Sequence, residues 1–384
     1  MNRLHVLCLA VFGMLAFQLP AVANSGAVLG IAAGLHLVLG NLLIGVGEGL
    51  LLAQIYRLSR LKCIATMILA NYFSSWIGGL VILPVFLTIP KVDLNNGWFW
   101  FWVMVVVAYA MTLVLEYPFI YWRLKGRKKR VRSSVEASLI TQSASYIVIF
   151  AWYWMNSRTT TFTEFGTVSP DRMSMPKDVI VYYFDSEDGD VYQARLNGSR
   201  RQMVFQLTGS RRGGDLFFEP GDLDTNRWNV AVNLFAPIGL DYWGHPTNWR
   251  SVVVGSNLLA ETIPHWFDDE RHPYNSGLPH PWGYAGQLGT ATNSPGRLYV
   301  EPSAGGGMYG SVSRNYRRIH FAYNSPFGSW KVRNAVRLPS DQILFQLGDD
   351  QICLLDPATR QVALLWRGRC PLPILELEPG VQTP

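Results

Sequence analysis

Arg123-Leu-Lys-Gly-Arg-Lys-Lys-Arg-Val-Arg132 is a short basic stretch between two long apolar segments. Seven of its ten residues are Lys or Arg. Positive charge at this density beside membrane-length apolar segments is retained on the cytoplasmic side, because moving it across a bilayer is unfavourable. The stretch therefore predicts the orientation of every segment around it.

Four apolar segments each reach the length of about 20 residues that a bilayer core requires. They lie at residues 27–55, 64–90, 98–122 and 135–156. The first and third connections between them are rich in Lys and Arg, whereas the second contains a single basic residue, Lys91. This alternation predicts an α-helical bundle of four transmembrane helices in the cytoplasmic (inner) membrane, with the chain after Asn156 on the extracytoplasmic side.

The N-terminal residues have the layout of a secretory signal. A single Arg3 precedes an apolar run, and the run is followed by the small-residue ending Ala21-Val22-Ala23. We predict a signal peptide over residues 1–23, with an uncleaved first helix as the alternative. The remaining domains are then 24–156 (four-helix transmembrane domain), 157–178 (linker) and 179–384 (extracytoplasmic domain).

The extracytoplasmic domain is predicted to be all-β. Short runs of β-branched and aromatic residues end at Gly, Asp, Asn or Pro. They lie at residues 179–184, 190–196, 202–207, 215–218, 228–232, 250–254, 297–300, 319–323, 342–345, 351–355 and 361–365.

Two segments of this domain each contain three predicted strands separated by two turns. They run from Val179 to Leu207, through turns at Asp188-Gly189 and Asn197-Gly198, and from Gln342 to Trp366. Each resembles a blade of a β-propeller, and together they cover about fifty residues. The resemblance implies a propeller-like fold, and a β-sandwich is the alternative.

The charge of the chain is divided between its halves. Residues 1–156 contain twelve basic and four acidic residues, so their net charge is +8, and the rest of the chain carries −2 of the overall +6. The excess positive charge therefore flanks membrane segments. This favours membrane lipids as partners and argues against nucleic acid, whose binding requires a basic face on a folded domain.

Four polar residues are predicted to form one layer inside the membrane. Counted at 1.5 Å per residue from the basic loops, Glu48, Asn71, Glu116 and Gln142 all lie roughly 10–15 Å from the cytoplasmic edge. Ionisable residues at this depth usually face a bundle interior or a water path. The layer therefore indicates either a proton or cation relay, in which one of two neighbouring carboxyls is protonated, or interhelical hydrogen bonding.

The first apolar segment carries two further polar residues at helical spacing, His36 and Asn41. Asn41 shares a face with Glu48, together with small residues that let a neighbouring helix approach. His36 falls on a second face.

Two further sets of residues are candidates for metal binding and crosslinking. His265, Asp268 and His272 can ligate zinc or copper, but their spacing matches no metal motif, and solvated loop histidines are the alternative. Cys353 and Cys370 are the only pair in the extracytoplasmic domain, and an oxidising compartment predicts a disulfide between them.

No signature of catalysis or of cofactor binding occurs in the sequence. The nucleophile elbow, the phosphate-binding loop and the dinucleotide fingerprint are absent. We therefore predict no cofactor and favour a non-enzymatic protein, a scaffold or sensor whose β-rich domain binds a ligand or a protein partner outside the membrane. The alternatives are a transporter-like or channel-like component that uses the polar layer and, third, a membrane-tethered hydrolase.

Overall fold

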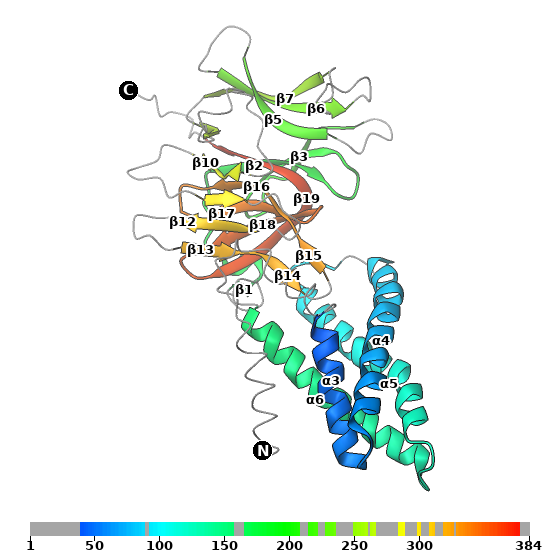
Figure 1. Cartoon of the computed structure of the whole chain (residues 1–384). Helices are drawn as coiled ribbons and strands as arrows, with labels where there is room; N and C mark the ends of the chain where they lie inside the picture. Colours follow the sequence, from blue (N-terminus) through cyan, green and yellow to red (C-terminus); the bar gives the residue numbers. More distant parts are fainter. Residues whose placement is uncertain are drawn as a thin grey trace. The chain divides into compact units, whose positions relative to one another are not determined.

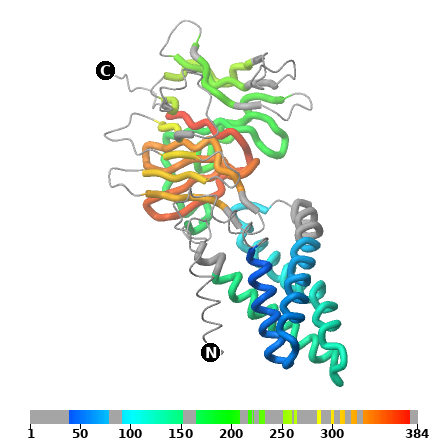
Figure 2. Tube along the Cα trace, in the orientation of Figure 1, coloured from blue at the N-terminus to red at the C-terminus, as the bar shows by residue number. Residues whose placement is uncertain are grey.

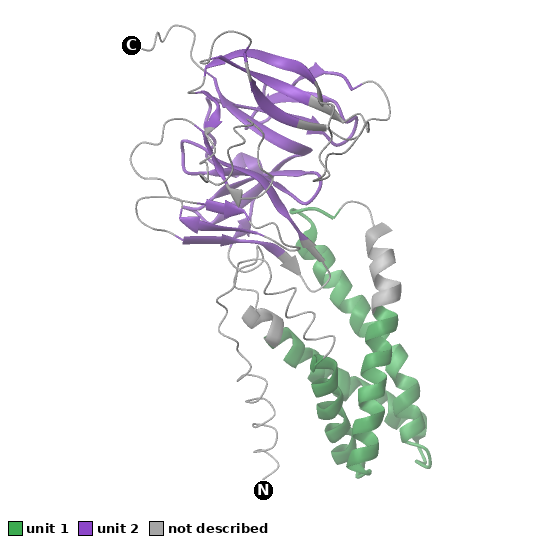
Figure 3. Cartoon of the chain, turned by 45° about the horizontal axis from the view of Figure 1, so that its top comes forward, with its two compact units in different colours: residues 1–23, 27–158, 324–328 green, residues 24–26, 159–323, 329–384 purple. Residues whose placement is uncertain are grey.

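A computed structural model describes most of the chain from residue 39 onward, with the remaining residues grey in Figure 2. The described residues are 39–88, 92–156, 165–207, 214–221, 227–235, 249–259, 262–265, 283–288, 298–300, 307–311, 318–325 and 328–376. The predicted signal peptide lies outside them. The chain divides into a helical unit (residues 1–23, 27–158 and 324–328) and a β-rich unit (residues 24–26, 159–323 and 329–384), coloured separately in Figure 3.

Four helices make up the described part of the helical unit (Figure 1). They are α3 (Asn41–Tyr56), α4 (Arg60–Thr88), α5 (Gly97–Arg123) and α6 (Arg130–Asn156), one for each predicted apolar segment. Helix α3 packs on α4 and α6, and α5 packs on the same two helices. Two helical stretches, Gly97–Arg123 and Arg130–Ala151, are long and apolar enough to cross a membrane.

The helical unit buries polar side chains and exposes apolar ones. Its buried polar residues are Asn41, Glu48, Thr66, Asn71, Ser74, Glu116, Ser134, Ser138, Thr141, Gln142 and Ser145. Its exposed large apolar residues include Leu43, Leu69, Trp76, Phe99, Val106, Val114 and Ile147. This distribution is the reverse of the one that water imposes on a soluble bundle.

Two glycines bring α3 and α4 into backbone contact. A Cβ atom on Gly45 would lie 2.6 Å from the Cα atom of Ile68, and one on Gly49 would collide with the Cα atom of Ile64. Only residues without a side chain permit this approach, which is the small-residue packing typical of membrane helices. Gly47, on another face of α3, has no atom near its Cβ position.

The basic stretch 123–132 also contributes to the bundle. Arg127 donates a hydrogen bond to the backbone oxygen of Tyr56, at the last residue of α3. Arg130 Nε donates to the backbone oxygen of Tyr121 near the end of α5, at 2.8 Å. Cations at these positions satisfy helix carbonyls that have no partner within the helix. The basic stretch therefore caps two of the helices.

The described residues after Asn156 form nineteen strands and one short 3-10 helix, and all of these elements except parts of β14 and β15 belong to the β-rich unit. The strands are β1 (Gly166–Thr167), β2 (Val179–Asp185), β3 (Val191–Arg195), β4 (Gln202–Phe205), β5 (Gly214–Pro220), β6 (Arg227–Phe235), β7 (Trp249–Leu259), β8 (Pro264–His265), β9 (Gly283–Tyr284), β10 (Gly286–Leu288), β11 (Leu298–Val300), β12 (Met308–Ser311), β13 (Arg318–Phe321), β14 (Tyr323–Ser325), β15 (Gly328–Trp330), β16 (Val332–Arg337), β17 (Ile343–Leu347), β18 (Gln351–Asp356) and β19 (Gln361–Leu375). The 3-10 helix is η2 (Pro170–Arg172). All eleven predicted runs contain strand residues.

One large mixed sheet dominates this unit (Figure 1). Its strand order is β4-β3-β2-β19-β18-β17-β16-β10-β8, with β1 paired to β19 in parallel. Strands β5, β6 and β7 form a second, antiparallel sheet, and β9, β11, β12 and β13 form a third. The unit is therefore a large curled sheet with smaller sheets beside it.

The two segments that resemble propeller blades do not form separate blades. Strand β19 pairs with β18 through its first half and, after the bend at Gly368, with β2 through its second half. Both segments thus belong to the same sheet, joined through one strand of 15 residues. The strand–turn–strand pattern predicts hairpins correctly, but it contains no information about the distant strand that completes each edge.

Strand β2 separates two apolar cores. Val179, Val181 and Tyr183 face one core, which includes Leu344, Leu354 and Ala363 from the large sheet. The alternate residues Tyr182 and Phe184 face the other, which includes Leu216 and Phe218 of β5. Alternation of side chains along a strand explains this division. The β5–β6–β7 sheet therefore shares a core with one face of the large sheet.

The predicted disulfide is not formed in the structure, where Cys353 and Cys370 are both thiols. Cys353 is buried in β18. Cys370 lies at an irregularity of β19 with a φ of 53°, and its backbone N–H donates to Gln346 Oε1 at 2.9 Å. Its side chain packs against the core that contains Phe184, instead of bonding to Cys353.

Candidate functional site

The structure brings the four predicted polar residues of the helical unit together in two hydrogen-bonded pairs. Asn71 Nδ2, on α4, donates to Glu48 Oε2 of α3 at 2.5 Å. Gln142 Nε2, on α6, donates to Glu116 Oε2 of α5 at 2.5 Å. Each pair therefore joins one carboxyl to one carboxamide on a neighbouring helix.

Ser74 links the two pairs across α4. Its hydroxyl group lies 2.7 Å from Glu116 Oε1 and 3.1 Å from the backbone oxygen of Asn71, one helical turn earlier. The two carboxyls are therefore connected through a single turn of α4. All five side chains are buried, with Glu116 fully so.

The two carboxyls differ in how well they are satisfied. Both oxygens of Glu116 accept hydrogen bonds, from Ser74 and Gln142. In Glu48, Oε2 accepts from Asn71, but Oε1 is buried and has no hydrogen-bond partner among the described residues. The hydroxyl of Ser145, on α6, lies beside the Glu48 carboxyl. Glu48 is therefore the incompletely coordinated member of the layer.

Two further site residues, His36 and Asn41, are predicted in the first apolar segment of the helical unit. Asn41 is buried at the first residue of α3, two turns before Glu48. His36 lies outside the described residues.

The predicted metal residues are described only in part. His265 is the last residue of β8, paired with Gln287 of β10, while Asp268 and His272 lie outside the described residues. Among the residues that the structure describes, no group of three His, Cys, Asp or Glu side chains is placed to hold a metal ion.

The acidic turn between β2 and β3 uses its carboxylates for the hairpin. Asp188 accepts hydrogen bonds from the backbone of Asp190 and from the hydroxyl of Tyr192, at 2.8 and 2.7 Å. The bond to Asp188 raises the pKa of Tyr192 to about 12. Burial acts to raise the pKa of Asp188, but the hydrogen bonds that it accepts outweigh this effect and lower the pKa.

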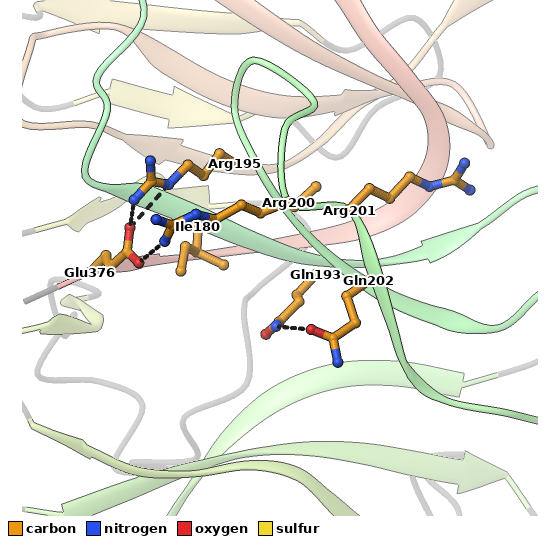
Figure 4. A pocket seen from close by; sticks show the side chains of 8 residues that line it. Ile180, Gln193, Arg195, Arg200, Arg201, Gln202 and Glu376 are labelled. Carbon is orange, nitrogen blue, oxygen red and sulfur yellow. Dashed lines mark hydrogen bonds and ion pairs between the residues drawn. The ribbon is translucent and has the colours of Figure 1, made fainter.

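A cleft of about 540 Å³ lies over strands β2, β3 and β4, beside the end of β19 (Figure 4). Two arginines converge there on one carboxylate: Arg195 Nε lies 3.1 Å from Glu376 Oε2, and Arg200 Nη1 lies 2.6 Å from Glu376 Oε1. Across the cleft Gln193 and Gln202 form a weaker amide pair at 3.4 Å. The cleft therefore combines charged and neutral hydrogen-bond donors around an acidic group.

Arg195 and Arg200 differ in their exposure. The side chain of Arg195 is 27% exposed and that of Arg200 is 64% exposed, so Arg200 offers N–H groups to solvent beside its ion pair. The third arginine of the cleft, Arg201, points away in Figure 4 and pairs with Asp185 at 2.6 Å. A planar guanidinium suits a carboxylate or a phosphate, because two of its N–H groups fit two oxygens.

Sequence reasoning missed this cleft, since Glu376 lies 181 residues after Arg195. The local signal was limited to Arg200-Arg201 after the Asn197-Gly198 turn, and adjacent arginines in a turn usually remain in water. Comparison with protein-family models, with curated proteins and with solved structures finds no match. The function is therefore argued from the residues alone.

Proposed function

We propose that this chain is a multi-pass membrane protein whose β-rich unit binds a carboxylate-bearing ligand or protein partner outside the cytoplasmic membrane. The observation that carries the proposal is the convergence of Arg195 and Arg200 on the Glu376 carboxylate within an open cleft. The chain's own carboxylate marks how an acidic group fits there. The role is that of a scaffold or sensor, without catalysis.

The membrane part of the proposal places all four helices α3 to α6 across the bilayer. Two helical stretches of sufficient length and apolarity support it, as do the buried polar and exposed apolar side chains of the bundle. The basic loops around Arg57 and Arg127 would then face the cytoplasm and the β-rich unit the outside. Residues 1–23 would be removed as a signal peptide.

Protease treatment of intact cells tests this orientation. Added trypsin should degrade the β-rich unit while the loop that contains Lys128 and Lys129, both exposed, is cut only after the membrane is opened. N-terminal sequencing of the purified protein should start at Asn24. Cleavage at Lys128 in intact cells would refute the orientation.

Binding in the cleft is tested with the full-length protein in detergent, with citrate and a short polyglutamate peptide as probes and calorimetry as the readout. Arg195→Gln together with Arg200→Gln should abolish binding, because charge-assisted hydrogen bonds to carboxylates supply most of the affinity. Arg172→Gln is the matched control, since Arg172 is an exposed arginine of the same unit outside the cleft.

Glu376→Gln separates ligand binding from structural pairing. If the cleft receives an external carboxylate, neutralising the internal one should tighten binding of the peptide by roughly tenfold, the equivalent of about 1.4 kcal/mol. If both probes fail to bind the wild-type protein and the Glu376→Gln variant, the binding proposal is wrong. The two arginines then serve only to hold the end of β19 through Glu376.

A further inference from the structure

The Glu48 carboxyl has an oxygen for which the described structure provides no donor. Oε2 accepts from Asn71, whereas Oε1 is buried and accepts no hydrogen bond from the described residues. A buried acceptor without a partner costs about 1–3 kcal/mol, and more when it is charged. Such a group needs an explanation, and a bound ion is one that also supplies the missing interaction.

The side chain beside Glu48 has other acceptors for its one hydrogen. The hydroxyl of Ser145 lies next to the Glu48 carboxyl, but it donates to backbone oxygens of its own helix, at 3.0 Å to Gln142 and 3.2 Å to Thr141. The hydroxyl has one hydrogen, so its lone pairs remain for another group. The Glu48 carboxyl of α3 and the Ser145 hydroxyl of α6 therefore lie side by side.

The surrounding charges do not compensate Glu48. Neither Glu48 nor Glu116 forms an ion pair within the described residues, and the nearest basic residue on α5, Arg123, donates its Nε to Cys63 Sγ at 3.4 Å. The titratable groups on which the Glu48 carboxyl acts are Glu116 of α5 and Tyr146 of α6. Helix α4 contributes neutral donors only, Asn71 and Ser74. The layer thus carries two carboxyls and no cation of its own.

We propose that Glu48 Oε1 and the hydroxyl oxygen of Ser145 form a binding site for a monovalent cation, either a proton or Na⁺, between helices α3 and α6. Carboxylate and hydroxyl oxygens are hard ligands that suit both ions. Glu116 is the charged neighbour of the site and lies outside it, because both of its oxygens are occupied. This inference is independent of ligand binding by the β-rich unit.

A hydrophobic carbodiimide tests the site in the full-length protein reconstituted into liposomes. The reagent enters the bilayer and modifies carboxyls that carry a proton, and peptide mass mapping locates the product. We expect Glu48 to be labelled when it carries a proton, and its labelling to decrease when bound Na⁺ displaces the proton or when rising pH removes it. Protection by Na⁺ but not by K⁺ at equal ionic strength identifies a Na⁺ site, and loss of labelling only as pH rises identifies a proton site.

Two variants and one internal control make the test specific. Ser145→Ala should shift the half-protecting cation concentration, Na⁺ or H⁺, by about tenfold, within the range that loss of a supporting contact produces at ion sites. Glu136, which is exposed and paired with Arg132 on α6, should react only with a water-soluble carbodiimide. Circular dichroism and gel filtration establish that Ser145→Ala remains folded.

The outcome that overturns the proposal does not depend on any variant. If wild-type Glu48 is never labelled, Oε1 exchanges no cation. The same conclusion follows if Glu48 is labelled but its labelling responds to neither Na⁺ nor pH. Glu48 is then a structural acceptor for Asn71. A Ser145→Ala protein with unchanged half-protection excludes Ser145 as a ligand and likewise overturns the two-oxygen site.

Discussion

Substitution of Gly45 by Ala tests whether close packing of α3 on α4 holds the bundle together. The added Cβ atom would lie 2.6 Å from Ile68 Cα, whereas ordinary contacts begin at 3.4 Å. The two backbones must therefore separate by about 0.8 Å, a gap that forfeits a quarter to a half of the dispersion attraction along the contact. The same shift would lengthen the Asn71–Glu48 hydrogen bond from 2.5 Å to roughly 3.3 Å, beyond its usual range.

The free energy of unfolding should reflect both effects. Overpacking costs about 1–3 kcal/mol, and the change from Gly to Ala in a helix returns about 0.5–1 kcal/mol. Gly45→Ala should therefore be destabilised by up to about 2.5 kcal/mol. Gly47→Ala, on the same helix with open space at its Cβ position, should instead be stabilised by about 0.5–1 kcal/mol.

Unfolding by a denaturing detergent, followed through tryptophan fluorescence, measures the difference between the two variants. The pair shares residue type, helix and chemical change, so general effects of alanine cancel in the comparison. If Gly45→Ala and Gly47→Ala are equally stable, the α3–α4 backbone contact does not support the fold, and the argument from glycine packing is wrong.

Three further predictions concern the β-rich unit. Tyr192→Phe should remove from an absorbance titration a tyrosine that ionises near pH 12. Its pKa of about 12 exceeds the unfolded value near 10, so its stabilising bond to Asp188 is complete below pH 10 and is lost as pH rises through about 12. Gln346→Ala should lower stability by about 2–3 kcal/mol in thermal unfolding, because this buried amide bonds four groups on neighbouring strands and turns. Gly368→Ala should be destabilised by about 1–3 kcal/mol, since its Cβ would lie 2.6 Å from a backbone oxygen, while Gly166→Ala, with open space, should be unaffected.

The polar layer shows what spacing alone can predict. Helix rise and the basic loops place Glu48, Asn71, Glu116 and Gln142 at one depth, and the structure brings them into two bonded pairs. Ser74, which links the pairs, was not predicted. A serine in an apolar helix usually bonds to its own backbone, so its sequence context does not distinguish one that also bonds across helices.

The β-rich unit shows where local patterns stop being informative. Alternation and turn residues predict the hairpins from Val179 and from Gln342, because both depend on neighbouring residues. The pairing of β19 with β2 joins residues almost two hundred positions apart. Neither hairpin sequence contains information about that distant partner strand. The sequence is therefore compatible with both a propeller and a sandwich.

The unequal satisfaction of the two carboxyls explains why a cation site would lie at Glu48 in particular. Burying a carboxylate costs several kcal/mol, and each hydrogen bond to a charged group returns about 1.5–3 kcal/mol. Glu116 receives two such bonds and Glu48 receives one, although the two are connected through the same turn of α4. Both oxygens of Glu116 already accept hydrogen bonds, so a further donor there adds little. A positive charge at Glu48 would instead supply the interaction that Oε1 lacks among the described residues.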